Sequence, residues 1–238
     1  MSSVQTNGQQ VPQKRLNLFT TYGVTSPFAE AYRVLRINLF QSNAQPLWSL
    51  GITGAAPGHG SSTTAANLGL IMGEVRSRVV LVDCDLLKPS LHRLFEIPNT
   101  VGFSSVLRGE VRLEQAWHTV DENPLLKVLP AGPSVPNPSA LLQPPVLDSL
   151  FKRLRSETDL LILDMPSVRV VSYTAFLASL VDGLLLVVRS GTTAVGVERI
   201  MQRMLKGANV IGAVLNKVPT DTSEVASYRD YALYNRKR

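Results

Sequence analysis

The stretch "GITGAAPGHGSSTTAANLGL", residues 51–70, decides the fold of this chain. An apolar strand that ends at Thr53 runs into a glycine-rich loop, and a helical segment begins near Ser62. Glycines allow such a loop to curl so that successive backbone N–H groups point at one centre, where the helix N-terminus adds partial positive charge. The stretch therefore predicts a phosphate-binding loop. Loops of this type carry a lysine before the hydroxyl residue, whereas this chain has Ser61 there.

The rest of the chain alternates short apolar runs with helical segments. The runs contain few polar residues, as expected for parallel strands that are covered on both faces. The predicted strands lie within residues 47–53, 78–85, 125–131, 159–165, 183–190 and 209–216. The predicted helices begin at Pro27 and near Ser62, Ser90, Pro144, Tyr173 and Thr193. The sequence therefore predicts an α/β fold with a doubly wound, mostly parallel sheet of the P-loop NTPase type and helices on both faces.

Composition divides the 238 residues into three parts. Residues 1–26 are rich in Gln, Ser, Thr and Asn without periodicity, which predicts a flexible leader. Residues 27–222 form the predicted P-loop domain, a length that one core can accommodate. Residues 223–238 contain three tyrosines and the basic end "NRKR", so we expect a mobile tail there.

Charge and cysteine content narrow the function classes only weakly. The net charge of +6 favours anionic partners such as nucleic acid, a membrane surface or phosphates, but the basic residues are spread along the chain. The one cysteine, Cys84, lies in an apolar run, so we expect a buried thiol, no internal disulfide and a reducing compartment. The sequence has no run of 18 or more apolar residues and no signal-peptide pattern, so we expect neither a membrane span nor secretion.

Acidic residues follow two of the predicted strands. Asp83 and Asp85 end one strand, and Asp164 ends another. Ligands of such sheets bind at the carboxyl ends of the strands, so we expect these carboxylates and the Ser62 hydroxyl beside the loop, where they suit Mg²⁺. An Asp at a strand end is equally often a turn or helix cap, and a glycine-rich loop can be a plain tight connection. It is the conjunction of these features that indicates a nucleotide site.

A dinucleotide-binding loop is an alternative, because Gly58-x-Gly60 is followed by an acidic residue at the end of the next strand. The third glycine of that fingerprint is absent, with Thr63 in its place. Residues 54–57 also separate the strand from the motif, as they do in a mononucleotide loop. The P-loop interpretation is therefore preferred.

Seven stretches carry the pattern of a known family. They are "SPFAEAYRVLRINL", "ITGAAPGHGSSTTAANLG", "VVLVDCDLLKPSLHRLF", "VLPAGPSVPNPSALL", "DLLILDMPSV", "LVDGLLLVVRSG" and "VIGAVLN". From about Pro27 to Asn216 the chain resembles the cytoplasmic kinase domain of the bacterial tyrosine kinases of capsule and exopolysaccharide synthesis, which belong to the deviant P-loop class. The helix motif E-x-x-R-x-x-R and the loop "PAGPSVPNP" are peculiar to that family.

The resemblance implies ligands and partners. The chain would bind ATP or ADP with Mg²⁺, form a homo-oligomer and autophosphorylate tyrosines near its C-terminus. It would act with a membrane-embedded regulator of polysaccharide chain length, here a separate chain, that holds it at the cytoplasmic face of the cell membrane. No nucleic acid is expected as a partner.

The resemblance also assigns a role to each matching residue. The implied nucleotide contacts are Gly54, Pro57, Gly58, Gly60, Ser61, Ser62, Thr63 and Asn216. The implied catalytic carboxylates are Asp83, Asp85 and Asp164, which together with Ser62 form the implied Mg²⁺ site. The implied oligomer interface is Glu30, Arg33 and Arg36, and the implied phosphoacceptors are Tyr228, Tyr231 and Tyr234. Three plainer interpretations stay open: a turn cap for Asn216, an exposed charged helix face for the interface residues, and a packed final helix for the tyrosines.

The departures from the family pattern fall at the catalytic positions. Ser61 stands in place of the loop lysine, Leu87 in place of an arginine and Tyr173 in place of a further acid. A serine donates one hydrogen bond but lacks the charge on which phosphoryl transfer depends. We therefore expect weakened or lost kinase activity.

Two alternative functions stay open. One is an active ATP-dependent tyrosine autokinase that takes its cation from Lys88 or from a neighbouring subunit. The other is a partitioning-type ATPase, which is disfavoured because Ala55 stands where that class has a further lysine. His59, beside the missing lysine, is expected to be an exposed loop residue and not a substitute cation.

Overall fold

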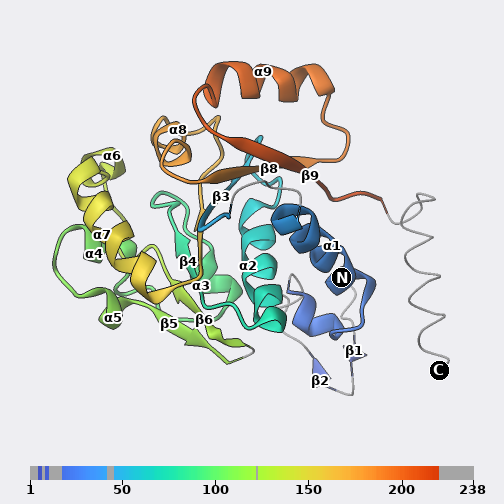
Figure 1. Ribbon diagram of the computed structural model, residues 1–238, viewed down its shortest axis with the longest axis horizontal. Coiled ribbons are helices and arrows are strands. Elements are labelled where there is room, and N and C mark those ends of the chain that lie inside the picture. The colour runs from blue at the N-terminus through green and yellow to red at the C-terminus, as the bar shows by residue number, and fades with distance from the viewer. Residues whose placement is uncertain (1–4, 7–8, 11–17, 42–45, 122, 220–238) are drawn as a thin grey trace.

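The computed structural model describes residues 5–6, 9–10, 18–41, 46–121 and 123–219. Figure 1 shows a twisted central sheet with helices on both sides of it. Within the described residues the main sheet has seven strands in the order β5-β6-β4-β7-β3-β8-β9. Neighbouring strands run parallel except for the edge strand β5, which pairs antiparallel with β6. The predicted α/β fold with a mostly parallel sheet is confirmed.

The strands of the main sheet are short, and its four central strands are buried almost throughout, as the apolar runs predict, whereas the edge strand β9 is partly exposed. Their bounds are β3 Ser49–Gly54, β4 Val79–Asp83, β5 His118–Val120, β6 Asn123–Leu129, β7 Leu160–Asp164, β8 Gly183–Arg189 and β9 Val210–Asn216. A separate two-stranded sheet pairs β1 (Gln5–Thr6) with β2 (Gln9–Gln10). Every strand predicted from an apolar run is present. The edge strand β5 was not predicted, because three residues are too few to show a period.

Two hydrophobic cores lie on the two faces of the sheet. Successive side chains of a strand point to opposite faces, so Val79 and Leu81 of β4 pack in one core and Val80 and Val82 in the other. The first core is covered by α1 (Pro27–Gln41), α2 (Ser61–Ile71) and α3 (Leu91–Leu94). The second core is covered by α4 (Phe103–Leu107), α5 (Leu113–Ala116), α7 (Pro144–Glu157), α8 (Tyr173–Ala178) and α9 (Ala194–Met204). The remaining elements are α6 (Pro138–Leu141), η2 (Phe19–Tyr22) and η3 (Met72–Val75).

The ordered body begins before the boundary that composition predicts at residue 26. Leu18 and Phe19 are buried in the first core, and the Phe19 backbone N–H donates to the Asn67 side-chain oxygen at 2.7 Å. Apolar residues inside a polar segment therefore attach η2 to the domain. The division of the chain into leader, domain and tail otherwise stays a prediction, because most of residues 1–17 and all of 220–238 lie outside the described residues.

No helix in the described part of the chain is both long and apolar enough to cross a bilayer. The implied phosphoacceptors Tyr228, Tyr231 and Tyr234 lie outside the described residues.

Candidate functional site

The loop between β3 and α2 adopts the curled conformation that the glycine pattern predicts. Gly58 has φ +75° and Gly60 has φ +98°, both in the left-handed region that favours glycine. A Cβ atom at Gly60 would also collide with Nδ2 of Asn216, whereas one at Gly58 would meet open space. Gly60 is therefore required for two reasons, its backbone angle and the close approach of Asn216.

Side chains and backbone from β8 and β9 hold the loop in place. The Asn216 amide donates to the His59 carbonyl oxygen at 2.9 Å, and the Ala55 backbone N–H donates to the Val187 carbonyl at 2.9 Å. Nδ1 of His59 accepts a hydrogen bond from the Arg189 backbone N–H at 3.1 Å. The loop is thus fixed to the carboxyl ends of two neighbouring strands before any ligand binds.

His59 differs from the exposed loop residue that the sequence suggested. It is partly buried and anchors the loop to β8. Burial lowers its pKa below the ordinary histidine value, and the positive charges of Arg189 and Lys217 lower it further. Because its Nδ1 accepts a hydrogen bond, the ring is neutral in this arrangement. The expectation that His59 does not replace the missing lysine agrees with this geometry.

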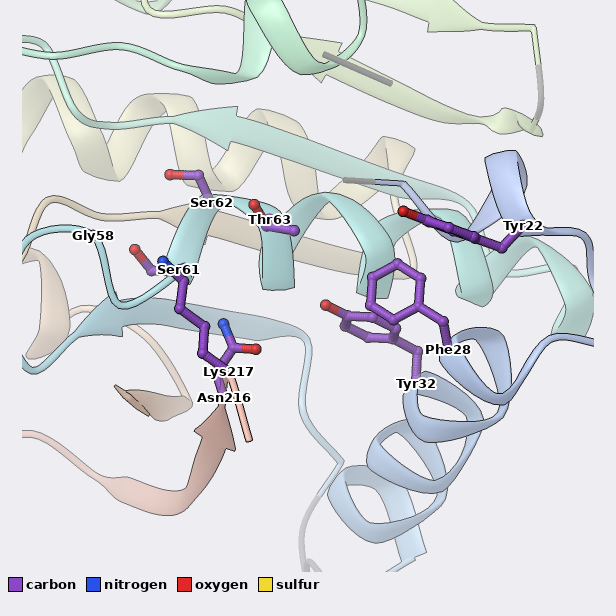
Figure 2. A pocket seen from close by; sticks show the side chains of 10 residues that line it. Tyr22, Phe28, Tyr32, Gly58, Ser61, Ser62, Thr63, Asn216 and Lys217 are labelled. Atoms are coloured by element: carbon purple, nitrogen blue, oxygen red, sulfur yellow. The ribbon is translucent and has the colours of Figure 1, made fainter. Parts of the chain in front are cut away.

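A cavity of about 550 Å³ opens beside the loop. It is lined by Tyr22, Phe28, Tyr32, Gly58, Gly60, Ser61, Ser62, Thr63, Asn216 and Lys217 (Figure 2). This volume lies in the range of small-molecule and cofactor sites. Five of the predicted nucleotide contacts in the loop, together with Asn216, therefore border a single cavity, whereas Gly54 and Pro57 do not line it.

Three aromatic residues form one wall of this cavity, and the sequence analysis missed them. The rings of Tyr22 and Phe28 meet edge to face at 5.5 Å, and those of Phe28 and Tyr32 do so at 5.3 Å. Burial raises the pKa of Tyr32 to about 12, so its hydroxyl stays protonated. The only sequence signal was their position on either side of the Pro27 helix start, which by itself does not indicate a ligand site.

The strand-end carboxylates lie side by side but have different surroundings. Asp83 and Asp164 occupy paired positions on β4 and β7, and both are fully buried. Asp83 accepts backbone hydrogen bonds from Ser90 at 2.9 Å and Leu91 at 3.0 Å, and thereby caps α3. Burial raises its pKa to about 6. The capping interpretation therefore holds for Asp83, whatever further role it has.

Asp164, unlike Asp83, has both carboxylate oxygens free to bind a ligand. Neither of its oxygens has a hydrogen-bond partner among the described residues. Burial raises its pKa well above the usual range, and the Asp83 charge raises it further. The Ser62 side chain is near enough to lower this pKa, although the pair falls short of hydrogen-bond geometry. A buried polar group without a partner is costly, so this geometry suits a cation or a water.

Asp85 shapes the turn after β4. Its Oδ1 accepts from the backbone N–H groups of Leu87 at 3.2 Å and Lys88 at 2.9 Å. Leu87 and Lys88 are both exposed, and neither lines the cavity beside the loop.

The described residues offer few side-chain ligands for Mg²⁺. Among them no group of three or more His, Cys, Asp or Glu side chains could hold a metal ion. Mg²⁺ in phosphate sites keeps several waters and takes one or two carboxylates together with the phosphate oxygens. The unpartnered Asp164 and the Ser62 hydroxyl fit that donor set.

Tyr173 and Cys84 form a buried structural pair next to the acids. Tyr173 donates to the Cys84 carbonyl oxygen at 3.5 Å, and burial raises the pKa of both side chains. The expected burial of the free cysteine is confirmed. Position 173 therefore carries a packed, neutral aromatic ring beside the acids.

The helix residues assigned to an oligomer interface make contacts within the chain. Arg33 donates to Glu74 at 2.6 and 2.9 Å and to Glu30 at 3.1 Å, and Arg36 donates to Glu74 at 3.3 Å. The Arg33 guanidinium holds the pKa of Glu74 below its usual value. These ion pairs join α1 to η3 within one chain. A neighbouring subunit that bound the same arginines would have to contact them alongside Glu74. The interface stays a prediction.

Comparison with known proteins gives several relatives of similar length. The tyrosine-protein kinase YwqD of Bacillus subtilis (strain 168) is 34% identical over 216 residues, which cover 88% of this chain and 87% of YwqD. The putative tyrosine-protein kinase CapB of Staphylococcus aureus is 30% identical over 207 residues, covering 85% of this chain and 90% of CapB. The succinoglycan biosynthesis transport protein ExoP of Rhizobium meliloti (strain 1021) is 29% identical over 93% of this chain, but only 28% of ExoP is covered. No model of a protein family matches the chain.

Solved structures of similar proteins have the same fold. The chimerical protein CapA2B2 has a TM-score of 0.80 at 29% identity, covering 86% of this chain and 91% of that one. The kinase domain of the Escherichia coli tyrosine kinase ETK has a TM-score of 0.73 at 32% identity, covering 82% of this chain and 78% of that one. The septum site-determining protein MinD of Pyrococcus horikoshii, complexed with Mg-ADP, has a TM-score of 0.58 at 22% identity over 76% of each chain, a likeness of fold alone.

Proposed function

This chain belongs to the family of bacterial tyrosine-protein kinases, and on that premise we propose that it is a nucleotide-binding regulatory subunit of capsule or exopolysaccharide polymerisation and export whose phosphoryl-transfer activity is weakened or lost. One observation carries the proposal. The phosphate loop keeps its left-handed glycines and its anchors to β8 and β9, while position 61 bears a serine. The cradle for a nucleotide is therefore intact, and the cation of its loop is missing.

The missing charge weakens transfer more than binding. Phosphoryl transfer relies on positioning and on stabilising the charge that spreads over the transferred group. Losing one well-placed donor costs about 3 kcal/mol at the transition state, or a rate factor on the order of a hundred to a thousand. Losing a full positive charge costs at least as much. Binding of the nucleotide in its ground state still depends on the backbone N–H groups of the loop and on the N-terminus of α2, which remain in place.

ATP or ADP with Mg²⁺ is the proposed ligand. Gly58, Gly60 and Thr63 would hold phosphates through backbone N–H groups, and Asn216 would border the base. Ser62 and Asp164 would hold the metal ion, which when bound neutralises phosphate charge. Asp83 would act on this site through its charge, since its oxygens already cap α3.

The proposed partners follow from the family. A membrane-embedded chain-length regulator, supplied as a separate chain, would place this protein at the cytoplasmic face of the cell membrane. ExoP, whose name links it to succinoglycan biosynthesis and transport, aligns with this chain over a fraction of its own length. Homo-oligomerisation through Glu30, Arg33 and Arg36 is part of the same proposal, as is a C-terminal tail that receives phosphate from its own or another kinase.

Calorimetric titration and an autophosphorylation assay on the purified chain test the proposal. We expect ADP and ATP to bind with micromolar or weaker affinity in the presence of Mg²⁺, and we expect no phosphotyrosine to accumulate. Ser61→Lys should tighten nucleotide binding, because it restores the loop cation. Rapid accumulation of phosphotyrosine on the natural chain would refute the loss of activity and would favour the active autokinase. A chain that binds no nucleotide at all would refute the proposed site.

A further inference from the structure

A lysine that the sequence analysis did not consider borders the phosphate loop. Lys217 follows directly after Asn216, where β9 ends. Figure 2 shows its side chain extending from the end of the strand toward Ser61, and both residues line the same cavity. Among the residues that line this cavity, Lys217 is the one with a charged side chain.

The end of β9, directly before Lys217, is well fixed. Asn216 accepts a hydrogen bond from the Ser190 backbone N–H at 2.8 Å through its carbonyl, and its side chain donates to the loop. Lys217 itself has φ +56°, a left-handed conformation that a lysine rarely adopts. In the part of the chain that the structure describes, the two other non-glycine residues with positive φ are Arg76 and Glu96, which follow short helices, where this conformation is common. At the end of a strand it is unusual.

The ammonium group of Lys217 has no competing anion in the described part of the chain. No ion pair or hydrogen bond of its side chain occurs there. Its charge nevertheless acts on the loop, because it lowers the pKa of His59. A lysine that faces a phosphate cradle without a carboxylate partner is available to an anionic ligand.

The other cations near the loop fit this role less well. Arg169 and Arg189 also act on His59 through their charges, but they do not line the cavity. Lys88 follows β4 and does not line it either. His59 is neutral in this arrangement, for the reasons given above.

From these observations we infer that Lys217 is the cation that binds the phosphate groups of the nucleotide in this protein, in the absence of a lysine at position 61. The inference rests on the proposed nucleotide site and names a binding residue for it. A lysine ammonium is a compact point charge that suits phosphate. The positive charge thus enters the site from the end of β9 and not from the loop.

The test is the dissociation constant for ADP, ATP and adenosine in the presence of Mg²⁺, measured by calorimetry at fixed ionic strength. Lys217→Asn removes the charge with a residue that tolerates left-handed φ. We expect it to weaken ADP and ATP binding about tenfold, the order of one charge-assisted contact, and to leave adenosine binding unchanged. Lys217→Arg should keep affinity within about threefold, because it retains the charge.

The matched control is Arg189→Gln, which removes an equal charge near the loop from a residue that does not line the cavity. It should change affinity less than about twofold, as a screened charge does. Melting temperatures of all variants check that they fold. If Lys217→Asn and Arg189→Gln weaken ADP binding equally, or if Lys217→Asn weakens adenosine binding as much as ADP binding, the inference is wrong.

A double-mutant comparison separates this inference from the proposed function. If Lys217 binds the phosphates, Ser61→Lys should improve ADP affinity more in the Lys217→Asn background than in the natural chain, because the two cations serve one ligand group. Equal improvement in both backgrounds would overturn the inference and leave the nucleotide site standing. A natural chain that binds neither ADP nor ATP would overturn both.

Discussion

Gly60→Ala should destabilise this protein more than Gly58→Ala, although both glycines have positive φ in the same loop. A left-handed backbone costs a residue with a Cβ about 1–2 kcal/mol. Replacing glycine by alanine also reduces the conformational entropy of the unfolded chain, which offsets about 0.4–1 kcal/mol of that cost. The Cβ of alanine at 58 meets open space, so the net cost of Gly58→Ala should be about 0.5–1 kcal/mol by these figures.

The same substitution at 60 adds a collision with Nδ2 of Asn216. Asn216 must move, and its hydrogen bond to the His59 carbonyl is lost, at a further cost of about 1 kcal/mol or somewhat more. We therefore expect Gly60→Ala to lower the free energy of unfolding by about 1.5–2.5 kcal/mol in total. Urea denaturation followed by circular dichroism measures both variants.

Asn216→Ala supplies the internal control. If the collision is the cause, the double variant Gly60→Ala with Asn216→Ala should be less destabilised than the sum of the two single variants by about 1 kcal/mol. A Gly60→Ala variant that is no less stable than Gly58→Ala, or strict additivity with Asn216→Ala, would refute the reasoning.

Three further predictions concern the charged groups. Asp164→Asn should raise the free energy of unfolding without Mg²⁺ by about 1 kcal/mol, because the amide avoids the cost of burying this carboxyl group, which must lose its hydration and take up a proton on folding. The variant should also weaken Mg²⁺-dependent ADP binding, and a destabilised variant in urea denaturation would contradict this reasoning. Glu74→Gln should lower stability at pH 7 by about 1 kcal/mol, a value already reduced for solvent screening. The pKa of Glu74 is lower in the folded state than in the unfolded state. The stability difference between the natural chain and Glu74→Gln should therefore be fully present above the unfolded-state pKa and disappear as the pH falls through the folded-state pKa. Urea denaturation of both proteins across pH 2–7 would detect this change. Arg33→Ala combined with Arg36→Ala should reduce the mass of any oligomer measured by light scattering, and an unchanged mass would count against the helix interface.

The apolar runs predicted the strands of the parallel sheet, because a strand buried on both faces leaves a compositional signal that needs no knowledge of its neighbours. The loop at 54–60 was predicted equally well, since curled backbone requires glycine locally. The edge strand β5 and the four-residue helices α5 and α6 were not predicted, because they are too short to show a hydrophobic period.

The roles of the acids could not be separated from the sequence. Asp83 and Asp164 both end apolar strands and look equivalent. In the fold, the Asp83 carboxylate accepts hydrogen bonds from the backbone N–H groups of Ser90 and Leu91, whereas the side chain of Asp164 has no hydrogen-bond partner among the described residues. The difference depends on where the chain goes after each strand.

Sequence alone determined the fold class, the position of the phosphate loop and the absence of a lysine at 61. Each of these features depends on residues that are adjacent in the sequence, so that local composition or local backbone conformation is enough to predict it. Only the tertiary structure decided which side chains surround that loop. Asn216 reaches His59 across 157 residues of sequence, and Lys217 lines the same cavity as Ser61. The carboxyl ends of parallel strands meet at one edge of a sheet however far apart they lie along the chain, and no pattern in the sequence states which of them will be neighbours.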